Sequence, residues 1–330
     1  MASPLTDPFG RTITYLRLSL TDRCDLRCHY CLPQQARFMA KRDLLTIDEL
    51  DRVGSAFVRL GVTKLRLTGG EPLVRPGAVD LARRLGRHLD GGGLSELVMT
   101  TNGTQLARHA EGLANAGIRR INVSLDHLDP AEYARITRGG RLAGVLEGIA
   151  AAQAAGIAVK INTVALACDN ADILPDMARW AHGRGLAITF IEVMPMGEIG
   201  ADRTDQHIPL DAVRAQLDAE LGLQPLAKST GGPARYARTA GGGEIGFITP
   251  ISENFCGGCN RVRVDAGGQL HACLGRDENV DLKAALREHS DDAALDRAIA
   301  ELIARKPERH DFAITRAQPA VARAMAATGG

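Results

Sequence analysis

The chain contains 330 residues, of which 40 are Lys or Arg and 39 are Asp or Glu, so its formal net charge is only +1. This balance gives no overall field that would draw the chain onto nucleic acid or a membrane surface, and an anionic ligand therefore needs a local cluster of cationic side chains. The opening residues lack the charged and apolar regions of a signal peptide, so we expect a cytoplasmic protein.

The first 195 residues alternate between short β-rich runs and helical patterns. A strand over 13–20 precedes a helix that begins with a capping box at Thr46 and Glu49 and ends near Leu60. Further strands are expected over 62–68, 95–101, 118–125, 157–164 and 186–193, and helices near 77–89, 105–116, 130–155 and 171–184. The weakly charged stretch 142–159 belongs to this series and is not a membrane span. Six such units predict a parallel sheet, either a partial barrel or an open doubly wound sheet.

The predicted strands alternate between apolar and polar side chains, and several of the polar residues are basic. The residues that share the polar faces are Arg17, Ser19, Lys64, Arg66, Thr68, Asn122, Ser124, Asp126, Lys160 and Asn162. A packed barrel interior consists mainly of Val, Ile and Leu, and an antiparallel sheet with one solvated face would lack the regular intervening helices. We therefore expect an open lumen that holds a polar, anionic ligand.

The pattern changes near residue 196, so we place a domain boundary between 1–195 and 196–330. The second segment has a predicted helix near 209–221, a glycine-rich stretch over 229–246, short strands, and helices near 281–288 and 292–305. The segments 1–195 and 196–330 each contain one group of three cysteines. The seventh cysteine, Cys168, follows an apolar run and is interpreted as a small core residue.

The first cysteine group is Cys24, Cys28 and Cys31, in the long loop after the first strand. In an α/β barrel this end of the strands carries the active site. A structural zinc ion needs a fourth Cys or His, and His29 is a poor candidate because its neighbours already occupy the same tight loop. An iron–sulfur cluster can be held by three cysteines with one iron left open to a small molecule.

The second group is Cys256, Cys259 and Cys273, and it is interleaved with Arg261 and Arg263. These three cysteines could hold a second iron–sulfur cluster with an open iron, or a zinc ion that takes His271 as its fourth ligand.

The first group, C-x3-C-x2-C with Tyr30 before the last cysteine, resembles the signature of radical S-adenosylmethionine (SAM) enzymes. The "TGGEP" stretch at 68–72 is similar to the glycine-glycine-glutamate motif with which that superfamily binds the methionyl ammonium of SAM. Alone, this stretch would be an ordinary turn. The blocks "KLRLTGGEP", "TTNG", "RRINVSLD" and "FIEVMP", the second cysteine group and the final Gly-Gly together resemble the GTP 3',8-cyclase family, the molybdenum cofactor biosynthesis protein A.

The resemblance implies a partial (βα)6 TIM-like barrel whose C-terminal extension closes the open side. It implies two 4Fe-4S clusters and SAM as cofactors. In that family a 5'-deoxyadenosyl radical abstracts the ribose 3' hydrogen of GTP, and the resulting carbon radical attacks guanine C8. The implied partners are a flavodoxin-like or ferredoxin-like electron donor, the downstream cyclic pyranopterin monophosphate synthase, and a second copy of the chain in a homodimer.

Residue by residue, the family's motifs fall on three sets. The first cysteine group matches the cluster that binds SAM, and the second group matches a cluster that binds the substrate. SAM contacts match Tyr30, Gly70, Glu71, Ser124 and Met194. GTP contacts match Arg17, Lys64, Arg66, Thr100, Lys160, Arg261 and Arg263, and the tail that enters the active site matches Gly329 and Gly330.

Two features depart from this correspondence or lie outside it. Family members often carry Arg where Thr189 stands, so we expect either weaker triphosphate binding or compensation by another basic residue. Arg119 and Arg120 cannot both point inward from one strand, and neither is assigned.

Two other functions remain open at this stage. A radical SAM enzyme that modifies a peptide would not need a basic lumen and usually carries more C-terminal cysteines. A non-catalytic iron–sulfur or zinc protein that binds RNA would need a stacking platform, whereas aromatic residues make up 4% of this chain.

Overall fold

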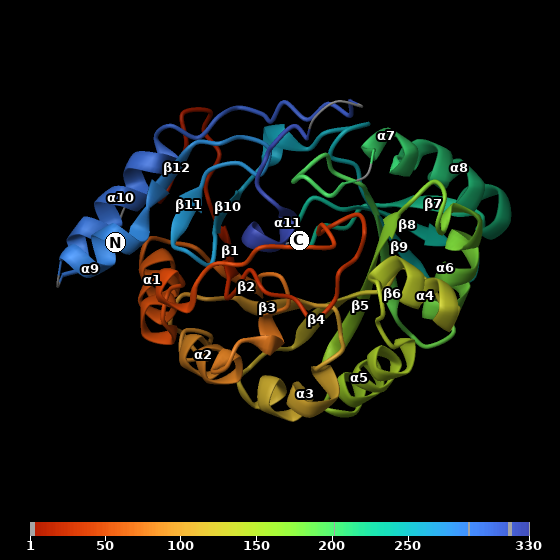
Figure 1. Ribbon diagram of the computed structural model, residues 1–330, viewed down its shortest axis with the longest axis horizontal. Coiled ribbons are helices and arrows are strands. Elements are labelled where there is room, and N and C mark those ends of the chain that lie inside the picture. The colour runs from red at the N-terminus through yellow and green to blue at the C-terminus, as the bar shows by residue number, and fades with distance from the viewer. Residues whose placement is uncertain (1–3, 201, 290, 316–318, 330) are drawn as a thin grey trace.

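The computed structural model describes residues 4–200, 202–289, 291–315 and 319–329, and their twelve strands form a single sheet. Figure 1 shows the sheet curved around a central space, with helices on its outer side. The strands are β1 Tyr15–Ser19, β2 Lys64–Thr68, β3 Glu96–Thr101, β4 Arg120–Ser124, β5 Ala158–Ala165, β6 Ala187–Glu192, β7 Leu223–Leu226, β8 Arg235–Thr239, β9 Glu244–Ile248, β10 Arg261–Val264, β11 Gln269–His271 and β12 Asn279–Asp281.

The helices follow the predicted rhythm closely, because the apolar positions at helical spacing are the ones buried against the sheet. They are α1 Ile47–Arg59, α2 Ala78–Gly86, α3 Leu106–Asn115, α4 Pro130–Thr137, α5 Leu142–Ala154, α6 Leu174–His182, α7 Arg203–Gln206, α8 Leu210–Leu221, α9 Leu282–Glu288, α10 Ala293–Ile303 and α11 Met325–Thr328. The predicted capping box of α1 is present: Glu49 N donates to Thr46 Oγ1 over 3.1 Å, and Thr46 N donates to Glu49 Oε2 over 2.7 Å.

The sheet runs in the order β12-β11-β10-β1-β2-β3-β4-β5-β6-β9-β8-β7. Strands β1 to β6 are parallel neighbours, β10 joins β1 in parallel, and β9 joins β6 in parallel. Strands β12 and β7 end the sheet without pairing to each other, which confirms the partial barrel. Segment 196–330 therefore adds strands to both edges of the sheet that segment 1–195 begins.

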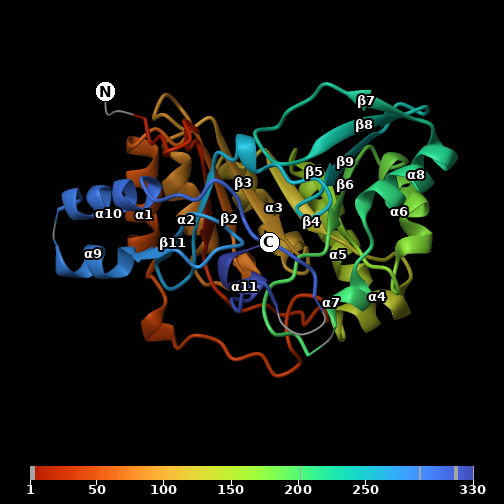
Figure 2. The same ribbon diagram turned by 90° about the horizontal axis from the view of Figure 1, so that it is seen from above.

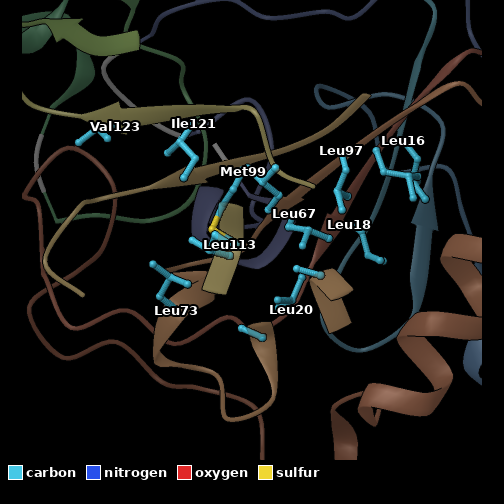
Figure 3. Close-up of a cluster of buried hydrophobic side chains, with 14 of the residues drawn as sticks. Leu16, Leu18, Leu20, Leu67, Leu73, Leu97, Met99, Leu113, Ile121 and Val123 are labelled. Carbon is cyan, nitrogen blue, oxygen red and sulfur yellow. The ribbon is translucent and has the colours of Figure 1, made fainter. Parts of the chain in front are cut away.

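The apolar faces of the strands point outward against the helices. Leu16, Leu18, Leu65, Leu67 and Met99 are completely buried there, and Figure 3 shows several of them beside Leu113 of α3. This layer supplies the hydrophobic stabilisation of the fold. The opposite, inward faces are polar, as the strand alternation predicts.

The C-terminal tail lies inside the ring of strands. Both views place α11 in the central space, although it is the last helix of the chain (Figures 1 and 2). The tail is attached to the segment after β6 by a bridge between Met196 and Val321, and by hydrogen bonds from Gly197 N to Val321 O and from Ala320 N to Pro195 O, both 2.8 Å long. The C-terminal segment thus covers the open side of the barrel from within.

Candidate active site

Two cavities lie in the lumen, and the first contains the cysteines of the first group. It encloses about 1090 Å³ of empty space at the carboxyl ends of β2 to β6. Its lining includes the predicted residues Cys24, Cys28, Tyr30, Cys31, Gly70, Thr100, Ser124 and Met194. The structure therefore brings together every residue expected at the SAM site except Glu71, together with Thr100, which was expected to contact GTP.

The loops after β1 and β2 pack directly against each other beside this cavity. Gly70 N donates to Thr21 O and Glu71 N donates to Arg23 O, each over 2.8 Å. A Cβ atom added to Gly70 would lie 2.4 Å from Arg23 O, so only glycine permits this contact. The glycine is thus needed for packing against the cysteine loop, a reason that the sequence motif alone did not reveal.

Glu71 does not line the cavity. Its side chain is completely buried, and its carboxylate accepts hydrogen bonds from Leu73 N, Thr101 Oγ1 and Asn102 N over 2.7–3.0 Å. Burial raises the pKa of Glu71 to about 7, although the three donors oppose this shift. In this structure Glu71 joins the ends of β2 and β3 and so holds the wall of the first cavity.

The three thiols of the first group lie in an environment that disfavours free thiolates. Burial raises the pKa of Cys24 to about 12 and that of Cys31 to about 11, and it raises the pKa of Cys28 well above its usual range. Three such cysteines around one cavity are a donor set for a metal cluster, because a bound metal supplies the positive charge that a thiolate lacks here.

Tyr30, the aromatic residue of the first cysteine motif, is held by the carboxylate of Asp126, which follows the end of β4. The hydroxyl of Tyr30 donates to Asp126 Oδ2 over 2.7 Å, while Asp126 Oδ1 accepts from Val164 N over 2.9 Å. Burial raises the pKa of Asp126 to about 6. This contact orients the loop that carries Cys28 and Cys31.

The two histidines considered as zinc ligands both lie against carboxylates. His29 lies against Asp169 and Gln206, and His271 lies 3.2 Å from Asp265 Oδ2. His271 also lines the cavity that contains the second cysteine group. Within the described ranges, no three His, Cys, Asp or Glu side chains are arranged to hold a single metal ion.

The second cavity adjoins the first and contains the second cysteine group. It encloses about 1140 Å³ of empty space, and none of its described lining residues is Asp or Glu. Its lining includes the predicted residues Arg17, Lys64, Arg66, Lys160, Cys256, Cys259, Arg261, Arg263 and Cys273. The cationic residues expected to contact GTP therefore converge on one cavity, as their positions on successive strands predicted.

Strand register explains this convergence. Arg17 lies level with Arg66 on one side and with Arg263 on the other, so their side chains leave three neighbouring parallel strands on the same face. Lys160 comes from β5, where burial, followed by repulsion from Arg66 and Arg120, lowers its pKa to about 7. The second cavity is thus strongly electropositive without a ligand.

Cys259 differs from the first three cysteines because cations surround it. Burial raises its pKa, but Arg261 and Lys306 outweigh that effect and lower the pKa to about 7. Arg261 Nη2 lies 3.9 Å from the sulfur, and Lys306 Nζ donates to Arg261 O over 3.1 Å. Cys259 therefore lies in electrostatic surroundings opposite to those of the first group, whereas burial raises the pKa of Cys273 as well.

The two cavities share a wall made of Asn162, Ile191, Met194 and Met325. The C-terminal tail contributes Met325, and Arg263 donates to Gly329 O. A Cβ atom at Gly329 would lie 2.2 Å from Thr68 Cγ2. The tail thus reaches the lumen at Gly329, while Gly330 lies outside the described residues.

Comparisons with known proteins agree with this arrangement. A family model described as the Radical SAM superfamily matches residues 18–181, and one described as Molybdenum Cofactor Synthesis C matches residues 186–312. A curated protein of Bradyrhizobium diazoefficiens named GTP 3',8-cyclase is 58% identical over 100% of this chain and 97% of its own length. A protein of Rhodopseudomonas palustris with the same name is 57% identical over 99% of this chain and 96% of its own.

The chain belongs to the GTP 3',8-cyclase family. It is therefore a radical SAM enzyme of molybdenum cofactor biosynthesis, and membership implies SAM and an iron–sulfur cluster. The crystal structure of Streptococcus suis SuiB bound to S-adenosylmethionine shares the fold, with a TM-score of 0.58 and 14% sequence identity over 82% of this chain and 63% of that chain.

Several residues of this GTP 3',8-cyclase homologue were missed or misplaced by the sequence analysis. Arg120 lines the second cavity beside Glu96, at 2.9 Å, whereas the neighbouring Arg119 bonds Ala114 O outside the lumen. The interpretation of Cys168 as a core residue is wrong: it lies in the loop after β5, where strand alternation has ended, and it is exposed.

Thr189, where the family often has Arg, is completely buried and lines neither cavity. A Cβ atom at Gly246 would lie 2.6 Å from its hydroxyl oxygen, so the site has no room for a longer side chain. Arg120 is a basic residue that the second cavity contains instead. Asn162, which the strand alternation placed on a polar face, lines both cavities. Tyr15 and Arg203 also line the cavities and carried no sequence signal beyond their place near strand and loop ends.

Among the described residues, no helix has the length and apolar character needed to cross a membrane.

Proposed function

We propose that the chain converts GTP into (8S)-3',8-cyclo-7,8-dihydroguanosine 5'-triphosphate. The observation that carries this proposal is the pair of adjoining cavities, each with three cysteines and with the cationic wall confined to the second. The first cavity suits a cluster that binds SAM, and the second cavity suits a cluster that lies beside a triphosphate. The names of the curated relatives support GTP as the substrate.

In the first cavity, Cys24, Cys28 and Cys31 would hold a 4Fe-4S cluster together with SAM. When bound and reduced, this pair would supply the radical chemistry that removes a hydrogen atom from the substrate. The chain's own contribution is to exclude water and to orient the ligand. Ser124 and Met194 line the cavity from the ends of β4 and β6, and Tyr30 is held in place by Asp126.

In the second cavity, Cys256, Cys259 and Cys273 would hold a second 4Fe-4S cluster, and the basic side chains would bind the triphosphate. Several guanidinium groups that converge at one place match the geometry of phosphate oxygens. Arg66 Nη1 donates to Thr100 Oγ1 over 2.8 Å, which fixes the guanidinium between the two cavities. The shared wall supports a binding mode in which a nucleotide in the second cavity has its ribose facing the first cavity.

The proposed partners are those that the family resemblance implies. Reduction of the first cluster requires an external one-electron donor, of the flavodoxin-like or ferredoxin-like class. The product then passes to cyclic pyranopterin monophosphate synthase, and the active form is a homodimer.

The test is anaerobic formation of 5'-deoxyadenosine by the reconstituted protein with SAM and a strong reductant. It compares GTP, ATP and no nucleotide. Strong formation only with GTP is the expected result, and equal formation in all three reactions would exclude GTP as the substrate. Iron analysis accompanies it: we expect about 8 irons per chain for two four-iron clusters, and about 4 after Cys259→Ser.

A further inference from the structure

Tyr15 lies in the middle of the cationic wall of the second cavity. It is 3% exposed, and its neighbours in strand register are Lys64 of β2 and Arg261 of β10. Its hydroxyl oxygen accepts a hydrogen bond from Arg66 Nε and also bonds Arg17. Lys64 Nζ lies 5.1 Å from the centre of the ring. The phenol of Tyr15 therefore has cationic side chains on both strands that pair with β1, namely β2 and β10.

The described lining of the second cavity contains no carboxylate that could balance these cations. Glu96 lies beyond it and is shared between Lys64 and Arg120. The other charged or titratable groups that line the cavity are Arg120, Lys160, Cys256, Cys259, Arg261, Arg263, His271, Cys273 and His310. Burial opposes ionisation of Tyr15, but Arg66, Arg17 and Lys64 outweigh it and lower the pKa of Tyr15 to about 7.

We propose that Tyr15 is a positioning residue that stands in for the ligand anion: its phenolate orders Arg17 and Arg66 in the empty cavity and takes up a proton when an oligophosphate binds. This inference rests on the proposed function, because it assumes that the second cavity receives the triphosphate. When the phosphates approach, the two guanidinium groups turn to them, and the hydroxyl loses the cations that kept it ionised. The proton comes from solvent, and the bound form contains a neutral tyrosine.

The proton uptake has a defined pH window. Below the lowered pKa of Tyr15 the hydroxyl is already neutral, so binding takes up almost nothing there. Between about pH 7.5 and pH 9.5, binding takes up close to one proton through Tyr15, and affinity falls as pH rises through that range. Lys160 adds a second proton in the same window, because its lowered pKa rises when an anion binds. The two contributions must therefore be separated.

Calorimetric titration of the reconstituted holoprotein with inorganic triphosphate measures the uptake. Each titration is run in two buffers with different ionisation enthalpies, at about pH 8.5, where neutral histidines contribute little, and at about pH 6, where Tyr15 is already mostly neutral. Tyr15→Phe is compared with Tyr133→Phe, whose hydroxyl is also buried but lies outside the cavity and has no hydrogen-bond partner in the described structure. Lys160→Met removes the proton taken up by Lys160, so the uptake that remains in this variant is the contribution of Tyr15.

At about pH 8.5 we expect Tyr15→Phe to lower the uptake by about one proton and Tyr133→Phe to leave it unchanged. The wild-type difference spectrum should also lose the tyrosinate band on binding, a readout that needs no variant. Binding with unchanged uptake in Tyr15→Phe, or with no loss of tyrosinate, overturns this inference alone. Absence of triphosphate binding at both pH values would overturn the proposed cavity as well.

Discussion

The Gly329→Ala substitution tests whether the C-terminal tail forms part of the active site. Gly329 has a backbone φ of +76°, where an L-residue costs about 1–2 kcal/mol. The new methyl group would lie 2.2 Å from Thr68 Cγ2, whereas ordinary contacts begin near 3.4 Å. Thr68 is 1% exposed and fixed within β2, so the tail must move by about 1.2 Å. That movement breaks the bond from Arg263 to Gly329 O.

Because a displacement of about 1 Å near the reacting groups can cost about 100-fold in rate, we expect a loss of that order in cyclisation. The assay is the rate of cyclised product under anaerobic turnover, together with the midpoint of thermal unfolding. The positive φ alone should lower the free energy of unfolding by about 1–2 kcal/mol, so the midpoint of thermal unfolding should fall modestly. Gly10→Ala is the matched control, since Gly10 has a φ of +77° and nothing lies within 4 Å of a Cβ atom there.

A second variant tests whether the loss of cyclisation in Gly329→Ala comes from the steric clash with Thr68. Thr68→Ala removes both atoms nearest the added methyl group and leaves Thr68 Cβ at 2.8 Å. In that background, Gly329→Ala should cost clearly less than it does in the wild type. Full cyclisation by Gly329→Ala, or an equal loss in both backgrounds, would refute the placement of the tail against β2.

Three further substitutions test the cationic wall and the cysteine loops. Lys160 has a lowered pKa in the folded state, so the folded protein loses stability as pH falls from about 10 toward 7. Lys160→Met should therefore raise the free energy of unfolding of the ligand-free protein by about 2–4 kcal/mol near pH 6 and by less near pH 10. Denaturant titrations at the two pH values measure this difference. Arg11 donates to Cys256 O, Glu308 O and Pro307 O and so holds the loop that carries Cys256. Because Arg11→Met removes these bonds, it should reduce bound iron from about 8 to about 4 per chain, and unchanged iron would contradict this. Thr189→Arg should destabilise by about 1–3 kcal/mol and should not tighten GTP binding, since Gly246 leaves no room; a tighter dissociation constant would contradict the described packing.

The strands and their inward faces could be predicted because each depends on local sequence periodicity. Lys64 and Arg66 alternate with leucines, and this alternation fixes which side chains share a face of β2. Parallel order then brings the polar faces of β1 to β6 to one lumen. The same alternation through Asn122 and Ser124 puts Arg120, and not Arg119, on the inward face of β4, although the sequence analysis assigned neither.

Other features depend on contacts between distant segments, which local patterns do not encode. β9 and β10 are close in sequence, yet they join opposite edges of the sheet. Glu71 matched a ligand motif, but its three donors come from its own loop and from the end of β3. Tyr15 resembles any aromatic residue at the start of a strand until its cationic neighbours on β2 and β10 are known.

The contrast between the two cavities explains why one chain needs both. Buried thiols without nearby cations, as at Cys24 and Cys28, become good ligands only when a metal is bound. The second cavity has the opposite bias, because its cations repel one another until an anion enters. A ligand that neutralises this wall therefore stabilises the fold and becomes fixed beside the first cavity in the same event. Met325 lines both cavities and Arg263 donates to Gly329 O, so the tail forms part of the wall between the two cavities.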